Sequence, residues 1–168
     1  MPTIRAERPS DIRAVRHVNE LAFETPAEAR LVDRLRRRGK LAVSLVAENG
    51  GHIVGHIAFS PVTIATRPQI KGLGLGPMAV SPSYQKQGVG SQLVREGLSR
   101  CRDLGAQFAV VLGHRHFYPR FGFVPASSFL LSCRWSVPEG VFMAIELKSG
   151  ALAGGEGLVC YEPEFNDV

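Results

Sequence analysis

The residues best suited to chemistry are a glycine-containing segment, Gln85-Lys86-Gln87-Gly88-Val89-Gly90-Ser91, that precedes a strongly helical stretch. The start of a helix exposes backbone N–H groups without partners and carries the positive end of the helix dipole, and both attract phosphate oxygens. Glycines at 88 and 90 remove the Cβ atoms that would hold an anion away from these N–H groups, and Lys86 adds a positive charge. The segment therefore predicts a phosphate-binding turn, with a turn that serves the backbone alone as the alternative.

Two common nucleotide-binding motifs do not fit this segment. No Gly-x-x-x-x-Gly-Lys-Ser/Thr occurs in the chain, which excludes a triphosphate P-loop. The dinucleotide fingerprint Gly-x-Gly-x-x-Gly is excluded as well, because Leu93 stands where the third glycine is required. The phosphate ligand must therefore be of another kind.

Hydrophobic periodicity indicates the elements that position this turn. Residues 73–80 form a mostly apolar strand, residues 91–104 a helix that ends at Gly105, and residues 108–112 a strand buried on both faces. Strand, glycine turn, helix and strand in this order predict a right-handed βαβ crossover with parallel strands.

The rest of the chain is expected to add strands and helices around this unit. Before it we expect a strand at 3–6, a helix after Pro9-Ser10-Asp11 and a second helix from near Pro26 to Gly39. Strands at 41–48 and 52–63 should follow, joined by the hairpin turn Asn49-Gly50-Gly51. A loop through Arg67, Pro68 and Gln69 should then lead to the strand at 73–80. After the unit we expect a strand at 141–147, a glycine- and alanine-rich connector at 149–157, and a segment at 158–165 that adds an edge strand or packs as a tail.

Composition limits the class of protein. The 168 residues, 45% hydrophobic and 21% charged, suit one globular domain, and the net charge of +5 favours an anionic partner without choosing among nucleic acid, acidic lipid and a phosphorylated cofactor. Residues 1–5 lack the apolar core of a signal peptide, and no apolar run approaches the ~20 residues that span a bilayer. We therefore expect a cytoplasmic protein with no membrane partner.

Cysteine and histidine spacing does not predict a metal site. Cys101, Cys133 and Cys160 are widely separated and form no Cys-x-x-Cys pair, which argues against a disulfide framework and a zinc site. His52 and His56 share one strand face, but no further ligand pattern accompanies them, so ordinary hydrogen-bonded histidines are expected.

Two motifs resemble a known family. Gln85-x-x-Gly88-x-Gly90, after Met78-Ala79-Val80, resembles the acetyl-coenzyme A signature Gln/Arg-x-x-Gly-x-Gly/Ala of the GNAT superfamily of N-acetyltransferases. The segment His116-Phe117-Tyr118-Pro119-Arg120-Phe121-Gly122-Phe123 resembles the YhbS-like bacterial branch of that superfamily. The order of expected elements matches the superfamily from about residue 3 to residue 147.

The resemblance implies an α/β fold, called α+β in some schemes. This GNAT-type fold has a mixed, largely antiparallel sheet of about six to seven strands, with a central parallel βαβ unit and helices on both faces. It implies an acetyltransferase domain at 1–148, followed by a C-terminal connector and tail at 149–168.

The resemblance also implies how acetyl-coenzyme A binds as co-substrate. Backbone groups of residues 85–91 would hold the pyrophosphate, and Met78, Ala79 and Val80 would pair with the pantetheine arm as strands pair in β-augmentation. The expected coenzyme-binding residues are Met78, Ala79, Val80, Gln85, Lys86, Gln87, Gly88, Val89, Gly90, Ser91 and Phe117.

Tyr118 is the candidate catalytic residue. A phenol with a pKa of ~10 is protonated at neutral pH and can supply the proton that the departing thiolate needs, so Tyr118 is expected to act as general acid. The alternative is that Tyr118 only packs with the neighbouring phenylalanines. A backbone N–H of residues 78–80 is expected to stabilise the oxyanion.

No general base is evident, and Glu24, Glu28 and Glu48 all remain open. Cys101 faces the core by periodicity and is expected to be inert, so direct transfer in a ternary complex is favoured over an acetyl-cysteine intermediate.

The expected function is therefore transfer of an acetyl group from acetyl-coenzyme A to a primary amine. The acceptor, a small molecule or a peptide, is not identified, although the first two helices, the loop near residues 23–26 and the segments after Leu112 should shape its site. Arg30, Arg34 and Arg37 are interpreted as an exposed helix face and not a binding site.

Other functions remain as alternatives. A coenzyme A-binding sensor or non-catalytic partner protein would keep the fold without the reaction. A nucleic-acid-binding module is suggested by the basic residues at 30–38, but no recognition motif accompanies them. A homodimer is left open.

Overall fold

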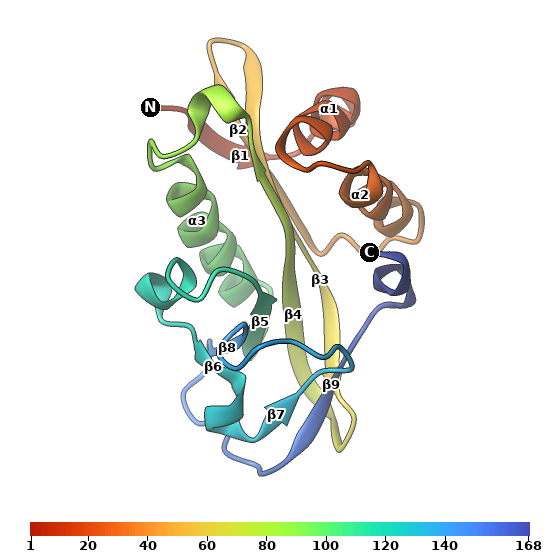
Figure 1. Cartoon of the computed structure of the whole chain (residues 1–168), viewed down its shortest axis with the longest axis vertical. Helices are drawn as coiled ribbons and strands as arrows, with labels where there is room; N and C mark the ends of the chain where they lie inside the picture. Colours follow the sequence, from red (N-terminus) through yellow and green to blue (C-terminus); the bar gives the residue numbers. More distant parts are fainter. The chain divides into compact units, whose positions relative to one another are not determined.

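The computed structural model describes all 168 residues, and they cluster into two compact units (Figure 1). The first unit contains Met1–Ser60, Gly76–Gly97 and Pro163–Val168, and the second contains Pro61–Leu75 and Leu98–Glu162. Strands β3 (His52–Ile64) and β4 (Arg67–Val80) and helix α3 (Val89–Asp103) each contribute residues to both units.

The first unit begins with three antiparallel strands. Strand β1 (Thr3–Ala6) pairs with β2 (Val43–Asn49), and β2 pairs with β3. The turn between β2 and β3 has φ angles of 58° at Gly50 and 82° at Gly51, a conformation that glycine adopts without a steric penalty. The hairpin predicted from these glycines is therefore confirmed.

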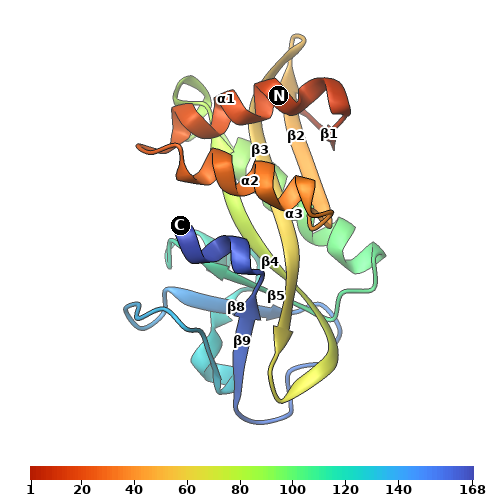
Figure 2. The ribbon, with the colours of Figure 1, turned by 90° about the vertical axis from the view of Figure 1, so that its right-hand side faces the viewer.

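Helices cover both faces of this three-stranded sheet. His56 of β3 contacts Asn19 of α1 (Ile12–Ala22), whereas a Cβ on the preceding residue, Gly55, would lie 3.1 Å from Leu93 of α3. Because neighbouring strand residues point to opposite faces, α1 and α3 lie on opposite sides. Figure 2 shows α1 and α2 (Ala27–Arg37) in front of β2 and β3, with α3 behind.

The α1–α2 side of this unit has its own apolar cluster. Val15 of α1, Val32 of α2 and Val46 of β2 are each at most 2% exposed and pack together, with Leu41 and Ile53 beside them. Helix α1 buries Val15, Val18 and Asn19, and α2 buries five residues between Ala29 and Leu35, so the buried positions of each helix recur at helical spacing on one face.

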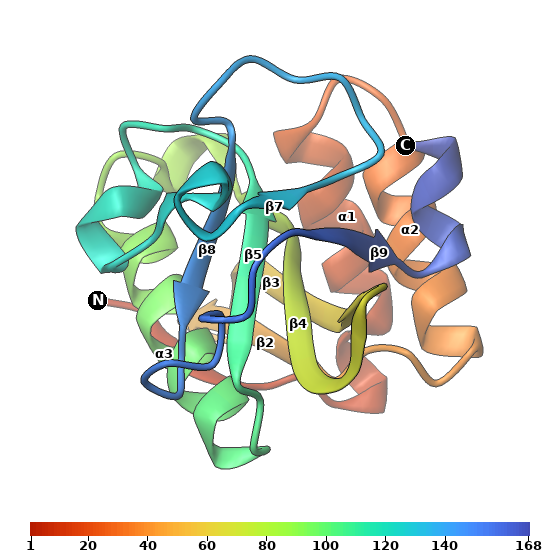
Figure 3. The ribbon, with the colours of Figure 1, turned by 90° about the horizontal axis from the view of Figure 1, so that it is seen from below.

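The second unit contains the parallel strand pair. The ladder between β4 and β5 (Phe108–Leu112) runs from Gly72 opposite Phe108 to Leu75 opposite Val111 (Figure 3). A Cβ on Gly72 would lie 2.1 Å from the Phe108 ring, so this glycine makes room for the aromatic side chain. Strand β4, helix α3 and the parallel strand β5 follow one another in the chain, as the predicted βαβ unit requires.

The remaining strands of the second unit are antiparallel or very short. Strand β8 (Phe142–Glu146) pairs antiparallel with β5, and β6 (Val124–Pro125) pairs with β8. Strand β9 (Gly157–Tyr161) pairs antiparallel with the end of β3 and parallel with β7 (Leu131–Ser132). The short 3-10 helices are Pro9–Asp11, Pro82–Tyr84, Tyr118–Phe121, Ala126–Phe129 and Pro163–Asp167.

The predicted fold class is confirmed. Seven strands have four residues or more, and the two-residue strands β6 and β7 bring the total to nine. The expected loop through Arg67, Pro68 and Gln69 is wrong, because β4 begins at Arg67 and the turn comprises only residues 65 and 66. A proline is tolerated near the start of a strand, where its missing N–H interrupts little of the ladder. Helix α3 begins at Val89, two residues before the expected start.

Candidate active site

The glycine turn lies in the first unit, directly before α3. The first helical hydrogen bond runs from the Gln92 N–H to the Gly88 carbonyl at 3.1 Å. The N–H groups of residues 89–91 precede this bond and are those that a helix leaves without an intrahelical acceptor. Gly88 has a φ of 89°, and the nearest atom to a Cβ placed on it would be the Met1 Cε at 3.7 Å. The turn conformation therefore favours glycine at 88, and the space beside Gly88 is open.

Side chains of the turn brace it against the preceding strand. The Gln85 amide donates to the Val80 carbonyl at 2.9 Å, and the Gln87 amide donates to the Ser83 carbonyl at 3.0 Å. The Ser81 N–H bonds to the Val54 carbonyl at 2.8 Å, which ties the end of β4 to β3. These bonds hold the turn beside residues 78–80. The side-chain amide nitrogens of Gln85 and Gln87 are both engaged in bonds to backbone carbonyls.

The other predicted residues of the turn differ in exposure. Lys86 is exposed and has a φ of 61°, while Val89 is 2% exposed and anchors the start of α3 in the interior. Ser91, Gly90 and the Met78 side chain are half-buried, and Ala79 is 2% exposed. The backbone N–H groups, the Lys86 ammonium and the half-buried Ser91 hydroxyl are thus the donors suited to meet an anion at the turn.

Tyr118 lies in the second unit, at the start of a 3-10 helix that follows β5. Its side chain is 5% exposed and packs edge-on against Phe117, with ring centroids 5.0 Å apart, and Phe123, with centroids 5.7 Å apart. Phe117 itself is half-buried and carries the Arg120 guanidinium 4.9 Å from its ring centre. The predicted pair Phe117 and Tyr118 is therefore in direct contact.

Burial changes the acidity of this phenol. Loss of solvent disfavours the phenolate and raises the pKa of Tyr118 from 10 to about 12. The pKa of Tyr118 thus lies above the ordinary phenol value of about 10 used in the sequence-based prediction. At neutral pH the hydroxyl is a fully protonated hydrogen-bond donor.

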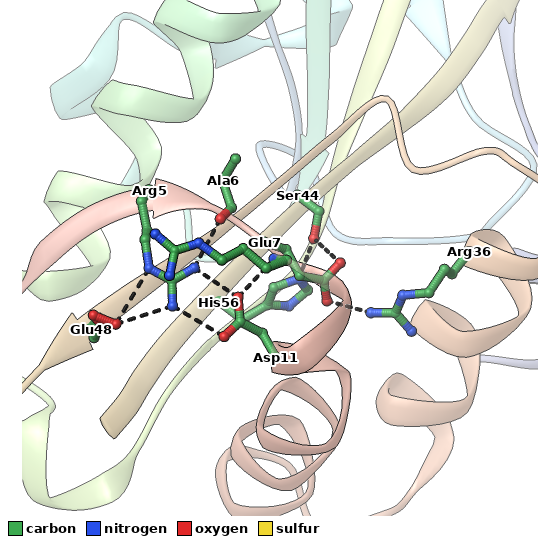
Figure 4. A network of polar contacts seen from close by, with 9 residues as sticks. Arg5, Ala6, Glu7, Asp11, Arg36, Ser44, Glu48 and His56 are labelled. Atoms are coloured by element: carbon green, nitrogen blue, oxygen red, sulfur yellow. Dashed lines mark hydrogen bonds and ion pairs between the residues drawn. The ribbon is translucent and has the colours of Figure 1, made fainter. Parts of the chain in front are cut away.

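The glutamates considered as general bases have different surroundings. The Glu48 carboxylate accepts a hydrogen bond from the Arg5 guanidinium at 3.1 Å, and Arg5 also binds Asp11 (Figure 4). Glu28 accepts a bond from the Thr25 hydroxyl at 3.4 Å, and Glu24 is exposed. Glu48 is thus held in an ion pair with Arg5.

The thiol of Cys101 is buried, as its position in the helix predicts. Its side chain is fully inaccessible, and burial raises the pKa of Cys101 to about 12. A thiol in this state is a poor nucleophile, because the thiolate is the reactive form.

His56 belongs to a buried hydrogen-bond chain that sequence reasoning missed. The Asn19 amide nitrogen donates to the Val15 carbonyl at 3.0 Å and contacts His56 Nδ1 at 3.2 Å, so Nδ1 is an acceptor. The proton therefore sits on Nε2, which donates to the Ser44 hydroxyl at 2.9 Å, and Ser44 donates to Glu7 at 3.2 Å (Figure 4).

This direction of donation argues against a serine nucleophile. A catalytic histidine would accept the serine proton, whereas His56 donates to Ser44. Burial, aided by the charge of Arg36, lowers the pKa of His56 to about 3, so the ring is neutral. The sequence predicted a hydrogen-bonded histidine at 56 but not its partners, and His52, expected on the same strand face, is exposed whereas His56 is buried.

The structure holds no group of three or more His, Cys, Asp or Glu side chains arranged to bind a metal ion. None of its helices combines the length and apolar character needed to cross a bilayer.

Comparisons with known proteins agree with this geometry. Residues 3–126 match the family model described as an acetyltransferase (GNAT) domain. The uncharacterized N-acetyltransferase YhbS of Escherichia coli (strain K12) is 40% identical over 164 residues, which cover 97% of this chain and 98% of that protein.

Two solved structures cover nearly the whole chain. The crystal structure of Escherichia coli YhbS in complex with CoA has a TM-score of 0.94 and 39% identity, and the match covers 98% of this chain and 92% of that one. A GNAT family acetyltransferase from Brucella melitensis in complex with acetyl-CoA has a TM-score of 0.81 and 36% identity, with 98% of both chains covered. The chain therefore belongs to the GNAT family of acetyltransferases.

Proposed function

We propose that the chain transfers the acetyl group of acetyl-coenzyme A to a primary amine by direct attack within a ternary complex. The observation that carries this proposal is the open glycine turn at the start of α3, with the N–H groups of residues 89–91 ahead of the first helical bond. Relatives that match the chain over nearly its full length were crystallised with CoA and with acetyl-CoA.

The coenzyme site would be built mainly from backbone. The N–H groups of Gly88, Val89, Gly90 and Ser91 would meet the pyrophosphate, and the exposed Lys86 would add charge. Gln85 and Gln87 would act indirectly, because their side chains hold the turn in shape. Met78, Ala79 and Val80 would offer backbone groups to the pantetheine amides, and Phe117 would contact the coenzyme beside Tyr118.

Tyr118 would supply the proton that completes the transfer. The neutral amine attacks the thioester carbon, the carbon–sulfur bond breaks, and the sulfur leaves with the bonding electrons. The phenol is protonated at neutral pH, donates its proton to sulfur as thiolate charge develops, and later recovers a proton from solvent. The raised pKa makes Tyr118 a weaker acid than an exposed phenol, so this transfer costs more free energy than it would from an ordinary tyrosine. A backbone N–H of residues 78–80 would stabilise the oxyanion. The attacking nitrogen loses its extra proton to water, so the products are an amide and the coenzyme thiol.

The test measures thiol release from acetyl-coenzyme A across a panel of small amines and peptides, together with coenzyme affinity. We expect Gly88→Asp to weaken coenzyme binding by about a hundredfold or more, because a carboxylate repels the pyrophosphate and charge-assisted bonds are lost. Gly105→Asp is the matched control, since Gly105 also has a positive φ, of 82°, with no atom near a Cβ. Tyr118→Phe should bind the coenzyme normally and lower kcat by about 10²-fold or more.

The two variants test coenzyme binding and the role of Tyr118 separately. Normal coenzyme affinity in Gly88→Asp would refute the phosphate assignment. Unchanged turnover in Tyr118→Phe would remove Tyr118 from the mechanism and leave coenzyme binding intact. Tight coenzyme binding with no turnover on any amine would favour a coenzyme A sensor.

We also propose that residues 1–148 form the acetyltransferase domain, that 149–168 extend it through β9, and that the protein works in the cytoplasm. Residues 149–168 contribute the buried side chains of Leu152 and Val159, so truncation after residue 148 should lower stability, and coenzyme binding that stays measurable in the truncated chain would support the boundary at 148. Cell fractionation should recover the protein with cytosolic markers. Loss of all coenzyme binding on truncation would show that the extension belongs to the domain.

A further inference from the structure

A pocket lined by positively charged side chains lies on the α1–α2 side of the first unit. It has a volume of about 230 Å³ and is lined by Arg16, Arg30, Asp33, Arg34 and Arg37, which we call the arginine pocket. Arg30 and Arg37 are exposed, as the sequence predicts for this face of α2. The concave surface that these side chains line calls for a further explanation.

The single acid of the arginine pocket is already neutralised. Asp33 is 8% exposed and forms ion pairs with Arg16 and with Arg36, the latter at 3.1 Å. Its two carboxylate oxygens are therefore each occupied by a guanidinium. Asp33 is thus not left to balance the charges of Arg30 and Arg37.

Of the three α2 arginines that line the pocket, only Arg34 forms an ion pair. Arg34 donates to Asp167 at 2.9 Å, but the Asp167 side chain is 70% exposed, and the Arg34 Nε is buried without an acceptor. Arg30 and Arg37 are exposed. Residues 30, 34 and 37 follow one another at spacings of four and three along α2, where like charges repel and destabilise a helix. A bound anion would relieve this repulsion.

We infer that the arginine pocket binds an oxyanion group, a phosphate or a carboxylate, carried by a small molecule. The planar guanidinium presents paired N–H donors that match the geometry of such anions. The arginine pocket is a small concave site of about 230 Å³, whereas a nucleic-acid backbone would need an extended basic surface.

The arginine pocket is distinct from the proposed coenzyme site. The coenzyme turn starts α3, and α1 and α3 lie on opposite faces of the three-stranded sheet of the first unit. Binding at one site can therefore be measured with the other disabled.

The test titrates inorganic phosphate and, separately, succinate into the full chain by calorimetry at low ionic strength. The pocket variant is Arg30→Gln combined with Arg37→Gln, and the control is Arg13→Gln combined with Arg102→Gln, two exposed helical arginines outside the pocket. Both variants remove the same charge. We expect the pocket variant to weaken anion binding by about tenfold or more, and the control to leave it unchanged.

A second series in the Gly88→Asp background separates the two sites. Anion binding that persists there and is lost on adding the pocket substitutions supports the arginine pocket, whether or not the coenzyme proposal holds. Preference for phosphate or for succinate identifies the anion. Equal binding in the pocket and control variants, or loss of all anion binding in Gly88→Asp alone, would overturn the inference. So would an RNA oligonucleotide that binds through Arg30 and Arg37 while neither small anion does.

Discussion

A Cβ placed on Gly113 would lie 2.6 Å from Cε2 of the Tyr118 ring, so the ring occupies the space that any side chain at 113 would need. Gly113 directly follows β5, and its N–H bonds to the Val141 carbonyl at 3.1 Å, which limits how far its backbone can move. Together with Phe117 and Phe123, Gly113 thus determines where the phenol of Tyr118 lies.

Gly113→Ala should therefore displace Tyr118. We expect a loss of about 1–3 kcal/mol in the free energy of unfolding, which is typical of overpacking, measured by urea denaturation. If Tyr118 supplies the proton, kcat should fall while coenzyme affinity is retained. In a Tyr118→Phe background the same substitution should lower kcat little further, because the acid is already absent. A full additive loss in the double variant would show that Gly113 acts on turnover by another route.

The raised pKa of Tyr118 predicts a change in stability at alkaline pH. The unfolded chain ionises this phenol near pH 10 and the folded chain only near pH 12, so its contribution is complete below pH 10 and is lost as the pH rises toward 12. The loss should approach about 1.4 kcal/mol per pH unit in this window. Urea denaturation of native and Tyr118→Phe chains across the window isolates the effect. Parallel stability curves for the two chains would show that Tyr118 ionises as an exposed phenol does.

The lowered pKa of His56 predicts a loss of folding stability at acidic pH. Its pKa falls from 6.5 to about 3 on folding, so its contribution is complete above pH 6.5 and is lost as the pH falls toward 3. The slope from this one group should approach about 1.4 kcal/mol per pH unit. His56→Gln should flatten that slope, whereas His52→Gln, at an exposed position of the same strand, should retain it.

A measurement that needs no variant checks the same assignment. Nitrogen chemical shifts of the His56 ring should report a proton on Nε2 and none on Nδ1 down to about pH 4, as the bonds to Ser44 and Asn19 require. A ring that gains its second proton near pH 6 would contradict the buried, neutral assignment.

The parts of the fold that depend on local backbone chemistry could be predicted from the sequence. Asn49-Gly50-Gly51 specifies a tight hairpin because both glycines adopt positive φ, and Gly105 ends α3 for the same reason. The start of β4 could not be predicted, because Pro68 usually indicates a loop and the sheet tolerates it here only near the beginning of the strand.

Features that depend on distant segments also lay outside sequence reasoning. The chain of bonds through His56 joins residues from α1, β2 and the segment after β1, and no spacing rule connects them. The pKa of Tyr118 rises because Phe117, Phe123 and the surrounding interior remove water, which residue type alone does not reveal. The candidate residues and their protonated state at neutral pH could be predicted in advance, but the size of the pKa shifts that burial causes could not.

Gly97 provides a test of packing between α3 and the sheet of the first unit. Replacing a glycine within a helix by alanine normally stabilises the helix by about 1 kcal/mol. Here a Cβ on Gly97 would lie 2.5 Å from Cε1 of Phe59, a fully buried side chain of β3, so the helix and the strand would have to separate. We expect Gly97→Ala to destabilise the chain by about 1–3 kcal/mol in urea denaturation, against a small gain for Ser99→Ala at an exposed position of α3.

Combining Gly97→Ala with Phe59→Leu distinguishes this contact from a general loss of helix packing. Phe59→Leu alone should cost about 1–3 kcal/mol by leaving a cavity, and the alanine methyl should partly fill that space. The double variant should therefore lose less than the two single losses added together, by about 1 kcal/mol or more. Strict additivity would place the cost of Gly97→Ala elsewhere in α3, because two residues in direct contact cannot be substituted independently.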